Sequence, residues 1–181
     1  KIGAARDLVM GQVVKAILLF RSRFWARMGY SDLSFLHAQD CPFPVFWTAA
    51  PFKTPLLTGW AGGPAAAALS SQPTARILGA ALASLSRCFG IPQRWVRSQL
   101  KRSWIVDWQS DPFALGAYSY TPVGKLNARH RLAKPVDQTL FFAGEATNNE
   151  GFSGTVHGAI TSGRRAAEEI RAVLHPARKV A

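Results

Sequence analysis

Acidic residues and cysteines are both scarce in this sequence. Its 181 residues include 10 Asp and Glu against 22 Lys and Arg, which gives a formal net charge of +12. The cysteines, Cys41 and Cys88, form neither a CxxC pair nor a dense framework, so the sequence favours neither structural disulfides nor a zinc site. We therefore expect reduced thiols in a cytoplasmic protein.

A long hydrophobic run is also absent. The longest apolar stretch, residues 13–20, is interrupted by Lys15 and falls far short of the roughly 20 residues that a membrane-spanning helix needs. We predict no transmembrane segment. With 48% hydrophobic and 18% charged residues, the chain has the composition of a folded domain and not that of a disordered tail.

The excess positive charge is spread along the chain. Residues 1–30 and 76–102 carry much of it without forming one basic run. There is no helix-turn-helix signature, no aromatic RNP-like motif and no basic heptad region, so nucleic-acid binding is disfavoured. A solvated basic face, or one that meets an acidic partner, explains the charge better. A basic chromatin-associated module is the alternative, and it would bind DNA in a salt-sensitive way.

The first part of the chain has the pattern of a mixed sheet with a flanking helix. We predict strands over residues 12–20, 45–48 and 56–61, because each is apolar and bounded by glycine, proline or a polar cluster. The helical spacing of apolar residues predicts a helix over 74–89, ended by Gly90. Aromatic and aliphatic residues over 94–108 predict a long half-buried strand.

The last part of the chain has a strand, loop and helix pattern. Residues 139–143, TLFFA, predict a buried strand that ends at Gly144 and Glu145. A helix is predicted from Val156 and is closed by Pro176. The residues expected on its apolar face are Ala159, Ile160, Gly163, Ala167, Ile170 and Leu174.

The segment from residue 140 to 169 carries the strongest chemical signal. The first turn of a helix has unpaired N–H groups and a positive dipole end, which stabilise an electron-rich group. Glycines in the loop allow a flat ligand to approach the backbone, and Glu145 can accept hydrogen bonds from ligand hydroxyls. The alternatives are that the glycines serve turn geometry and helix packing, and that Thr155 is a plain N-cap.

Three ordered motifs resemble the FAD-dependent amine oxidase family, which includes monoamine oxidases, polyamine oxidases and flavin-dependent histone lysine demethylases. FFAGEAT followed by SGTVHGAITSGRRAA resembles the C-terminal flavin signature of that family. MGQVVKAILLFRSRFW, residues 10–25, is similar to a segment of its substrate domain, and WQSDPFALGAYSYTPVG, residues 108–124, to the stretch before the flavin signature. LLTGWAGGPAA is a looser match between them.

The resemblance implies an incomplete α/β fold. Residues 1–110 would form part of a substrate-binding domain with a mixed sheet, and 111–181 the C-terminal strand and helix of a Rossmann-like FAD-binding domain. The boundary is soft, because Tyr118 would contribute to the pocket from beside it. The family fingerprint for the ADP half of FAD, a GxGxxG after the first strand, is not in the sequence. We expect the C-terminal piece of a longer protein, or one half of a split enzyme that lacks its dinucleotide-binding half.

The resemblance also implies roles for residues that bind the cofactor. Gly144 and Glu145 would contact FAD near its ribityl and pyrophosphate region. Gly154, Thr155 and Val156 would place backbone groups at the pyrimidine edge of the flavin, where a helix N-terminus stabilises the negative charge of the reduced state.

Lys15 matches a catalytic lysine of the family, which contacts the flavin through a water and is implicated in its reoxidation by oxygen. The alternative is a snorkelling lysine at a strand edge. The chain has no Ser-His-Asp or metal-binding constellation, since its four histidines are dispersed.

Aromatic residues would line the substrate pocket. Tyr118 matches one wall of the aromatic cage of monoamine oxidases, where a ring face orients the amine. Thr155 stands in place of the second tyrosine, so this position is closer to demethylase-like relatives. Trp108 and Phe152 are further candidates for the lining, although a buried aromatic is more often core. Ala117 stands where monoamine oxidases tether FAD by cysteine, which predicts noncovalent FAD.

The reaction implied is oxidation of an amine to an imine by hydride transfer to FAD, followed by reoxidation with oxygen to give hydrogen peroxide. We expect the chain by itself to bind FAD weakly and to have negligible activity. The alternatives are a related FAD-dependent desaturase or porphyrinogen-type oxidase, and a non-catalytic subunit that retains the fold.

Overall fold

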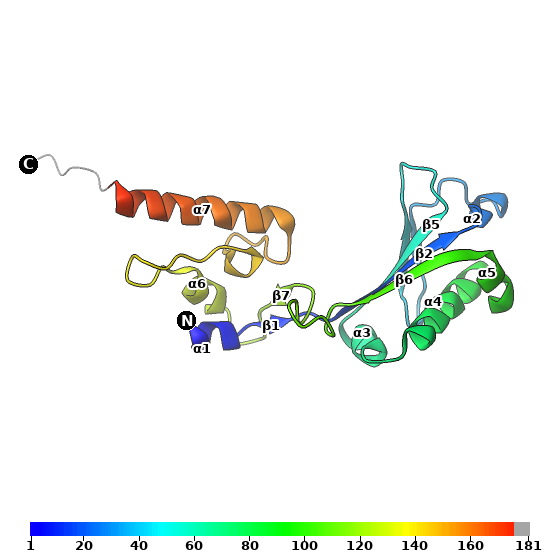
Figure 1. Cartoon of the computed structure of the whole chain (residues 1–181), viewed down its shortest axis with the longest axis horizontal. Coiled ribbons are helices and arrows are strands. Elements are labelled where there is room, and N and C mark those ends of the chain that lie inside the picture. The colour runs from blue at the N-terminus through cyan, green and yellow to red at the C-terminus, as the bar shows by residue number, and fades with distance from the viewer. Residues whose placement is uncertain (176–181) are drawn as a thin grey trace, which may run out of the picture. The chain divides into compact units, whose positions relative to one another are not determined.

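The computed structural model describes residues 1–175, which divide into two compact units (Figure 1). The central unit is Gln12–Ala117. The terminal unit combines Lys1–Gly11 with the chain from Tyr118 onward. The chain therefore crosses between the units twice, between residues 11 and 12 and between residues 117 and 118. The sequence predicted one boundary, between residues 110 and 111. The assignment of the units to substrate-binding and FAD-binding domains stays a prediction.

A five-stranded antiparallel sheet forms the centre of the central unit, with the strand order β3-β4-β5-β2-β6. The strands predicted over residues 12–20, 45–48 and 56–61 are confirmed as β2, β4 and β5. The bounds are β2 (Val13–Phe20), β3 (Phe35–His37), β4 (Val45–Thr48), β5 (Leu56–Gly62) and β6 (Leu100–Asp107).

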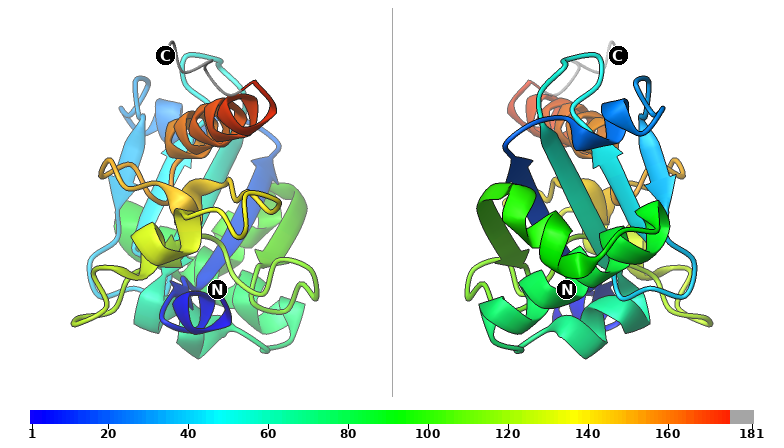
Figure 2. Two further views of the ribbon diagram at one scale, coloured as in Figure 1. Left: turned by 90° about the vertical axis from the view of Figure 1, so that its left-hand side faces the viewer. Right: turned by 90° about the vertical axis from the view of Figure 1, so that its right-hand side faces the viewer.

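Helices cover one face of this sheet. The helices of the unit are α2 (Phe24–Arg27), α3 (Gly63–Leu69), α4 (Thr74–Phe89) and α5 (Gln93–Gln99). Figures 1 and 2 show α4 and α5 lying along the sheet. The helix predicted over 74–89 is confirmed, and Gly90 ends it in the left-handed conformation with φ of 64°. The alternate residues Val14, Ala16, Leu18 and Phe20 of β2 are buried in a core that includes Leu82 and Leu85 of α4.

The continuous strand predicted over 94–108 is wrong in its first half, which forms α5. Pro92 stands at the N-cap of this helix, Val96 is fully buried, and Trp95 packs edge-on against Phe24 at 5.3 Å between ring centroids. Burial of Val96 in the core stabilises the helical conformation of this segment. Residues 100–107 form β6, which pairs with β2.

The terminal unit has short elements and one long helix. They are α1 (Ile2–Arg6), β1 (Val9–Met10), β7 (Ser119–Tyr120), α6 (Ala128–Ala133), the 3₁₀ turn η1 (Glu145–Thr147) and α7 (Val156–Leu174). β1 pairs with β7 in antiparallel fashion, with Val9 opposite Tyr120 and Met10 opposite Ser119. This pairing joins the beginning of the chain to the segment after the central unit.

The buried strand predicted over 139–143 is not formed. A single bridge joins Val136 to Leu140, and Leu140 is 58% exposed. A strand needs a neighbouring strand for its hydrogen bonds, and none of the described residues provides one at this segment.

The helix predicted from Val156 is confirmed, but its buried side differs from the expected apolar face. Gly158, Ser162 and Ala166 are buried, while Ile160 is 52% exposed. Small side chains face the unit because the preceding loop lies close against the helix. Pro176 lies outside the described residues.

The fold is mixed α/β with two sheets. Within residues 1–175, no helix has the length and apolar character needed to cross a membrane.

Candidate functional site

The carboxylate of Glu145 is the centre of a hydrogen-bonded cluster in the terminal unit. Gly144, with φ of 120°, brings the chain into η1, and its N–H donates to Ser162 Oγ of α7 at 2.9 Å. Glu145 Oε1 accepts from the Ser119 N–H at 2.8 Å. Oε2 accepts from the Ser119 hydroxyl at 3.0 Å and from the Gly154 N–H at 2.7 Å. The side chain keeps 24% of its surface exposed, so its carboxylate is held by the protein and still reachable.

Arg129 of α6 supports this cluster from the other side of Ser119. Its Nη1 donates to the Ser119 hydroxyl at 2.8 Å, its Nη2 to the Ser119 carbonyl at 2.9 Å, and its Nε to Thr121 Oγ1 at 3.0 Å. Nη1 also lies 3.6 Å from Glu145 Oε2. The residue is only 8% exposed, and its charge is balanced locally by Glu145.

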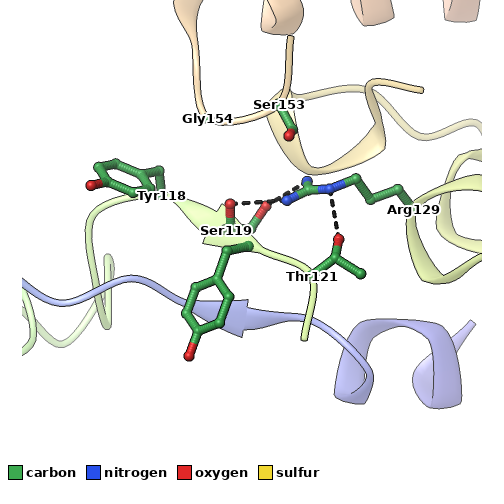
Figure 3. Close-up of a pocket in the computed structure, with 7 residues that line it drawn as sticks. Tyr118, Ser119, Thr121, Arg129, Ser153 and Gly154 are labelled. Atoms are coloured by element: carbon green, nitrogen blue, oxygen red, sulfur yellow. Dashed lines mark hydrogen bonds between the residues drawn. The ribbon is translucent and has the colours of Figure 1, made fainter. Parts of the chain in front are cut away.

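A cavity of about 360 Å³ lies beside this cluster (Figure 3). Seven residues line it, and they come from β7 and the residues on either side of it, from α6 and from the loop before α7: Tyr118, Ser119, Tyr120, Thr121, Arg129, Ser153 and Gly154. The cluster thus joins three separated segments of the sequence, and of the predicted site residues it brings together Glu145, Gly154 and Tyr118.

The loop before α7 is fixed by Asn148, which is 3% exposed. Its Oδ1 accepts from the N–H groups of Glu150 and Phe152 at 3.1 and 2.9 Å, and its Nδ2 donates to Thr161 Oγ1 at 2.9 Å. Gly154 has φ of 74°, a conformation that favours glycine. The loop therefore has one defined path into the helix.

Thr155 caps α7, as the N-cap alternative predicts. Its Oγ1 accepts from the Gly158 N–H at 3.1 Å and donates to the Phe152 carbonyl at 2.6 Å. The N–H groups of Val156 and His157 have no acceptor inside the helix, and Val156 is 78% exposed. The positive end of the helix dipole and two free donors are thus presented at the surface of the unit.

The two aromatic residues of the terminal unit that were predicted to line the pocket, Tyr118 and Phe152, are exposed and not buried in a core. Tyr118 is 39% exposed, and Phe152 is 47% exposed with its ring edge-on to His157 at 4.7 Å between centroids. Their side chains are available to a ligand.

Lys15 and Trp108 belong to the central unit. Lys15 lies in β2 between Trp60 of β5 and Val106 of β6. The residues on either side of it, Val14 and Ala16, point into the core, so Lys15 lies on the opposite, half-buried face of the sheet. The lysine therefore does not interrupt the core.

Trp108 directly follows β6, where its N–H donates to the Val13 carbonyl at 3.3 Å. The preceding residue, Asp107, is partly buried, which raises the pKa of its carboxyl. Hydrogen bonds from Ser110, Ser71 and Ser70 outweigh this effect and hold the pKa below its ordinary value. The chain that carries Trp108 is thereby fixed to the end of α3.

Sequence reasoning missed Arg129 and Ser119 in this site. Ser119 stands within the matched GAYSY stretch, but a small polar residue there has no distinctive pattern. Arg129 is one of 22 basic residues, and its burial depends on tertiary folding. Within residues 1–175, no group of three or more His, Cys, Asp or Glu residues is arranged to hold a metal ion.

The sequence of this chain matches a protein-family model and is similar to several known proteins. The family model described as "Flavin containing amine oxidoreductase" matches residues 1–171. "Possible lysine-specific histone demethylase 1" of Drosophila melanogaster is 31% identical over 183 residues, which cover 92% of this chain and 20% of that protein. "Peroxisomal N(1)-acetyl-spermine/spermidine oxidase" of Bos taurus is 30% identical over 199 residues, covering 97% of this chain and 38% of that protein.

Solved structures are similar as well. Cyclohexylamine oxidase from Brevibacterium oxydans superposes with a TM-score of 0.76 at 25% identity, covering 93% of this chain and 37% of that one. A putrescine oxidase variant gives a TM-score of 0.80 at 21% identity, covering 95% and 37%. The chain spans less than two fifths of the length of each of these four proteins. From the match over residues 1–171, the chain belongs to the flavin-containing amine oxidoreductase family.

Proposed function

We propose that this chain forms the substrate-domain and C-terminal flavin portion of an enzyme that oxidises an amine to an imine, with FAD as a noncovalent cofactor. When bound, FAD would supply the redox chemistry of this reaction: it would take up a hydride from the carbon next to the amine nitrogen and give two electrons to oxygen, which with two protons would form hydrogen peroxide. The central unit would belong to the substrate-binding domain and the terminal unit to the FAD-binding domain.

The observation that carries the proposal is the donor and acceptor set of the terminal unit. A carboxylate has about four lone-pair sites, and Glu145 uses three of them within the protein. The remaining site is on Oε1 of this side chain, which is 24% exposed, and it can accept a hydrogen bond from a hydroxyl of the ribityl chain or ribose. The residues present therefore fit a polyhydroxylated cofactor.

The start of α7 supplies the complementary donors. Val156 and His157 offer free N–H groups at the positive end of the helix. Such groups stabilise negative charge that develops at the pyrimidine edge of a flavin, and they need no reorganisation to do so. Gly144, Gly154 and Thr155 would hold the backbone in this form, because two of them have positive φ and the third caps the helix.

The remaining site residues are assigned by their chemistry and by the family match. Lys15 would supply a positive charge that stabilises oxygen as it is reduced. Tyr118, Trp108 and Phe152 would line the substrate pocket, where ring faces orient an amine. Ala117 has no side-chain nucleophile, which agrees with a noncovalent cofactor.

Anaerobic titration with FAD tests the proposal. We expect weak binding to the chain by itself and stoichiometric binding when a dinucleotide-binding half from a family member is supplied. In a separate assay of this assembly in the presence of oxygen, we expect peroxide and aldehyde to form from at least one amine of a panel. Flavin binding without turnover of any amine would contradict the oxidase assignment and favour a desaturase or a non-catalytic subunit. Tight binding by the chain alone would contradict the need for a second half.

A further inference from the structure

We infer that Arg129 is a positioning residue for Glu145, acting through Ser119. The inference rests on the proposed function, because it concerns the carboxylate that we propose for binding FAD. It adds a residue of α6 to a site otherwise formed by β7 and by the loop and helix of the flavin signature.

The contacts of Arg129 converge on Ser119. The guanidinium reaches both the hydroxyl and the carbonyl of Ser119, at 2.8 and 2.9 Å. Its third bond, from Nε to Thr121 Oγ1 at 3.0 Å, fixes the plane of the group. The distance from Nη1 to Glu145 Oε2 is 3.6 Å, which is too long for a good hydrogen bond. Arg129 therefore attracts the Glu145 carboxylate electrostatically at this distance. It also orients that carboxylate indirectly, by holding Ser119 in place.

The hydroxyl of Ser119 makes this geometry directional. A serine hydroxyl has one proton to donate and accepts through its lone pairs. Since Arg129 donates to that oxygen, the proton of Ser119 is directed to Glu145 Oε2. The N–H of the same residue holds Oε1. Both carboxylate oxygens are thus oriented by one residue, and Arg129 keeps that residue in place.

This orientation determines which acceptor site of Glu145 stays open. With the Gly154 N–H also bound to Oε2, rotation of the carboxylate would break at least one of its bonds. Loss of Arg129 would free the Ser119 hydroxyl to rotate and would leave a partly buried carboxylate without a neighbouring cation. The open site would then no longer be fixed relative to the cavity beside it.

If Arg129 only tied α6 to β7 and had no effect on Glu145, its variants would behave differently from those of a positioning residue. Arg131 provides a matched control on the same helix, because it pairs with Asp7 at 3.1 Å and is 54% exposed in its side chain. Arg129→Lys retains the positive charge, but a lysine ammonium cannot make the same three hydrogen bonds as the planar guanidinium. Ser119→Ala removes the hydroxyl while it keeps Arg129.

The experiment uses the chain together with the supplied dinucleotide-binding half and measures FAD affinity from flavin fluorescence. We expect Arg129→Lys, Arg129→Met, Ser119→Ala and Glu145→Gln each to weaken binding about tenfold, the size of one charge-assisted hydrogen bond. Combining Arg129→Met with Glu145→Gln should weaken it no further, because both act on the same contact. Arg131→Met should leave the affinity unchanged.

A second measurement needs no cofactor. In amide NMR spectra of the chain without FAD, the resonances of Ser119 and Gly154 should move in Arg129→Lys and Arg129→Met, while Arg131→Met leaves them in place. If wild type binds no FAD, the proposed function fails, and these resonances still decide whether Arg129 positions Glu145.

Two results would overturn the inference. One is an additive loss of affinity in the double variant, which would mean that Arg129 acts independently of Glu145. The other is a lowered melting temperature in folded Arg129→Lys with unchanged resonances of Ser119 and Gly154, which is the behaviour of a structural arginine.

Discussion

Gly158 is the residue that permits the loop of the candidate site to close onto α7. A Cβ built at this position would lie 2.0 Å from the Phe152 carbonyl oxygen, which is backbone and cannot rotate away. We expect Gly158→Ala to lower the free energy of unfolding by about 2 kcal/mol, as overpacking does. Gly163→Ala in the same helix is the control, since nothing lies within 4 Å of its Cβ position. That variant should gain up to about 1 kcal/mol. Chemical denaturation gives both values, and equal effects would contradict the packing role.

Lys15 is the residue for which a functional and a structural role separate most clearly. In the assembled enzyme we expect Lys15→Met to slow reoxidation by oxygen at least about tenfold, because a positive charge near oxygen is lost, while anaerobic reduction by the amine is retained. Stopped-flow absorbance measures the two half-reactions separately. Lys101→Met changes an exposed lysine of β6 and serves as the control. An unchanged rate of reoxidation in Lys15→Met would contradict the functional role and support the alternative of a snorkelling lysine.

At the scale of residues, the sequence predicts what depends on local chain geometry. Thr155 could be recognised as an N-cap, because a threonine before an apolar helical repeat has a local partner three residues on. Arg129 could not be recognised, because its partners are defined only when α6 folds beside β7. The flavin and substrate roles of the predicted residues stay proposals.

Asp107 joins two elements of the central unit. Its carboxylate accepts bonds from Ser70 and Ser71 after α3 and from Ser110 after β6. Because its pKa is lower in the folded state, it adds stability above its ordinary pKa of about 3.9, and this stability is lost as the pH falls through the lower folded value.

Substitution of this carboxyl should therefore remove part of the acid sensitivity of the central unit. We expect Asp107→Asn to be less stable than the unaltered chain at pH 6 and to lose less stability as the pH falls toward 3. Urea unfolding across this range measures the effect. Asp32→Asn, at an exposed position, is the control. Parallel pH profiles for Asp107→Asn and the unaltered chain would contradict the role of Asp107.

At the scale of elements, segments that have a long helical repeat or clear breakers on both sides were predictable, and segments with an ambiguous pattern were not. α4 has 16 residues with a clear helical period, and the eight-residue β2 is an apolar run bounded by glycine and a polar cluster, so these patterns predict their structures. α5 has seven residues, and its apolar residues fit a strand as well as a helix until Val96 is placed in the core. Residues 139–143 have a strand composition, but their structure depends on whether another strand lies beside them.

The whole molecule has an exposed connection between its two units. Phe113 and Leu115 are 97% and 65% exposed in the segment before the second crossing. We expect brief chymotrypsin treatment to cut first here, and mass spectrometry identifies the site. The two pieces should elute together until urea is added, because β1 and β7 would lie on different pieces. Phe113→Ser with Leu115→Ser should slow the cut, and pieces that separate without urea would contradict the pairing.

The division of the chain into two units was predictable from the sequence only in part. Motif order indicated two partial domains, but the return of Lys1–Gly11 to the terminal unit was not predictable. A two-residue strand such as β1 has no detectable period, and its partner is more than a hundred residues away. The register of Val9 with Tyr120 arises only in the folded chain.

The pairing of β1 with β7 also affects the order of events during synthesis. The ribosome must translate the central unit, about a hundred residues, before β7 exists, which takes roughly 5–20 s. α1 and β1 leave the exit tunnel before the central unit does, and they remain without their partners until β7 follows. For that interval the nascent chain presents Val9 and Met10 to chaperones, so this segment, although it is made before the central unit, completes its folding after that unit has been made.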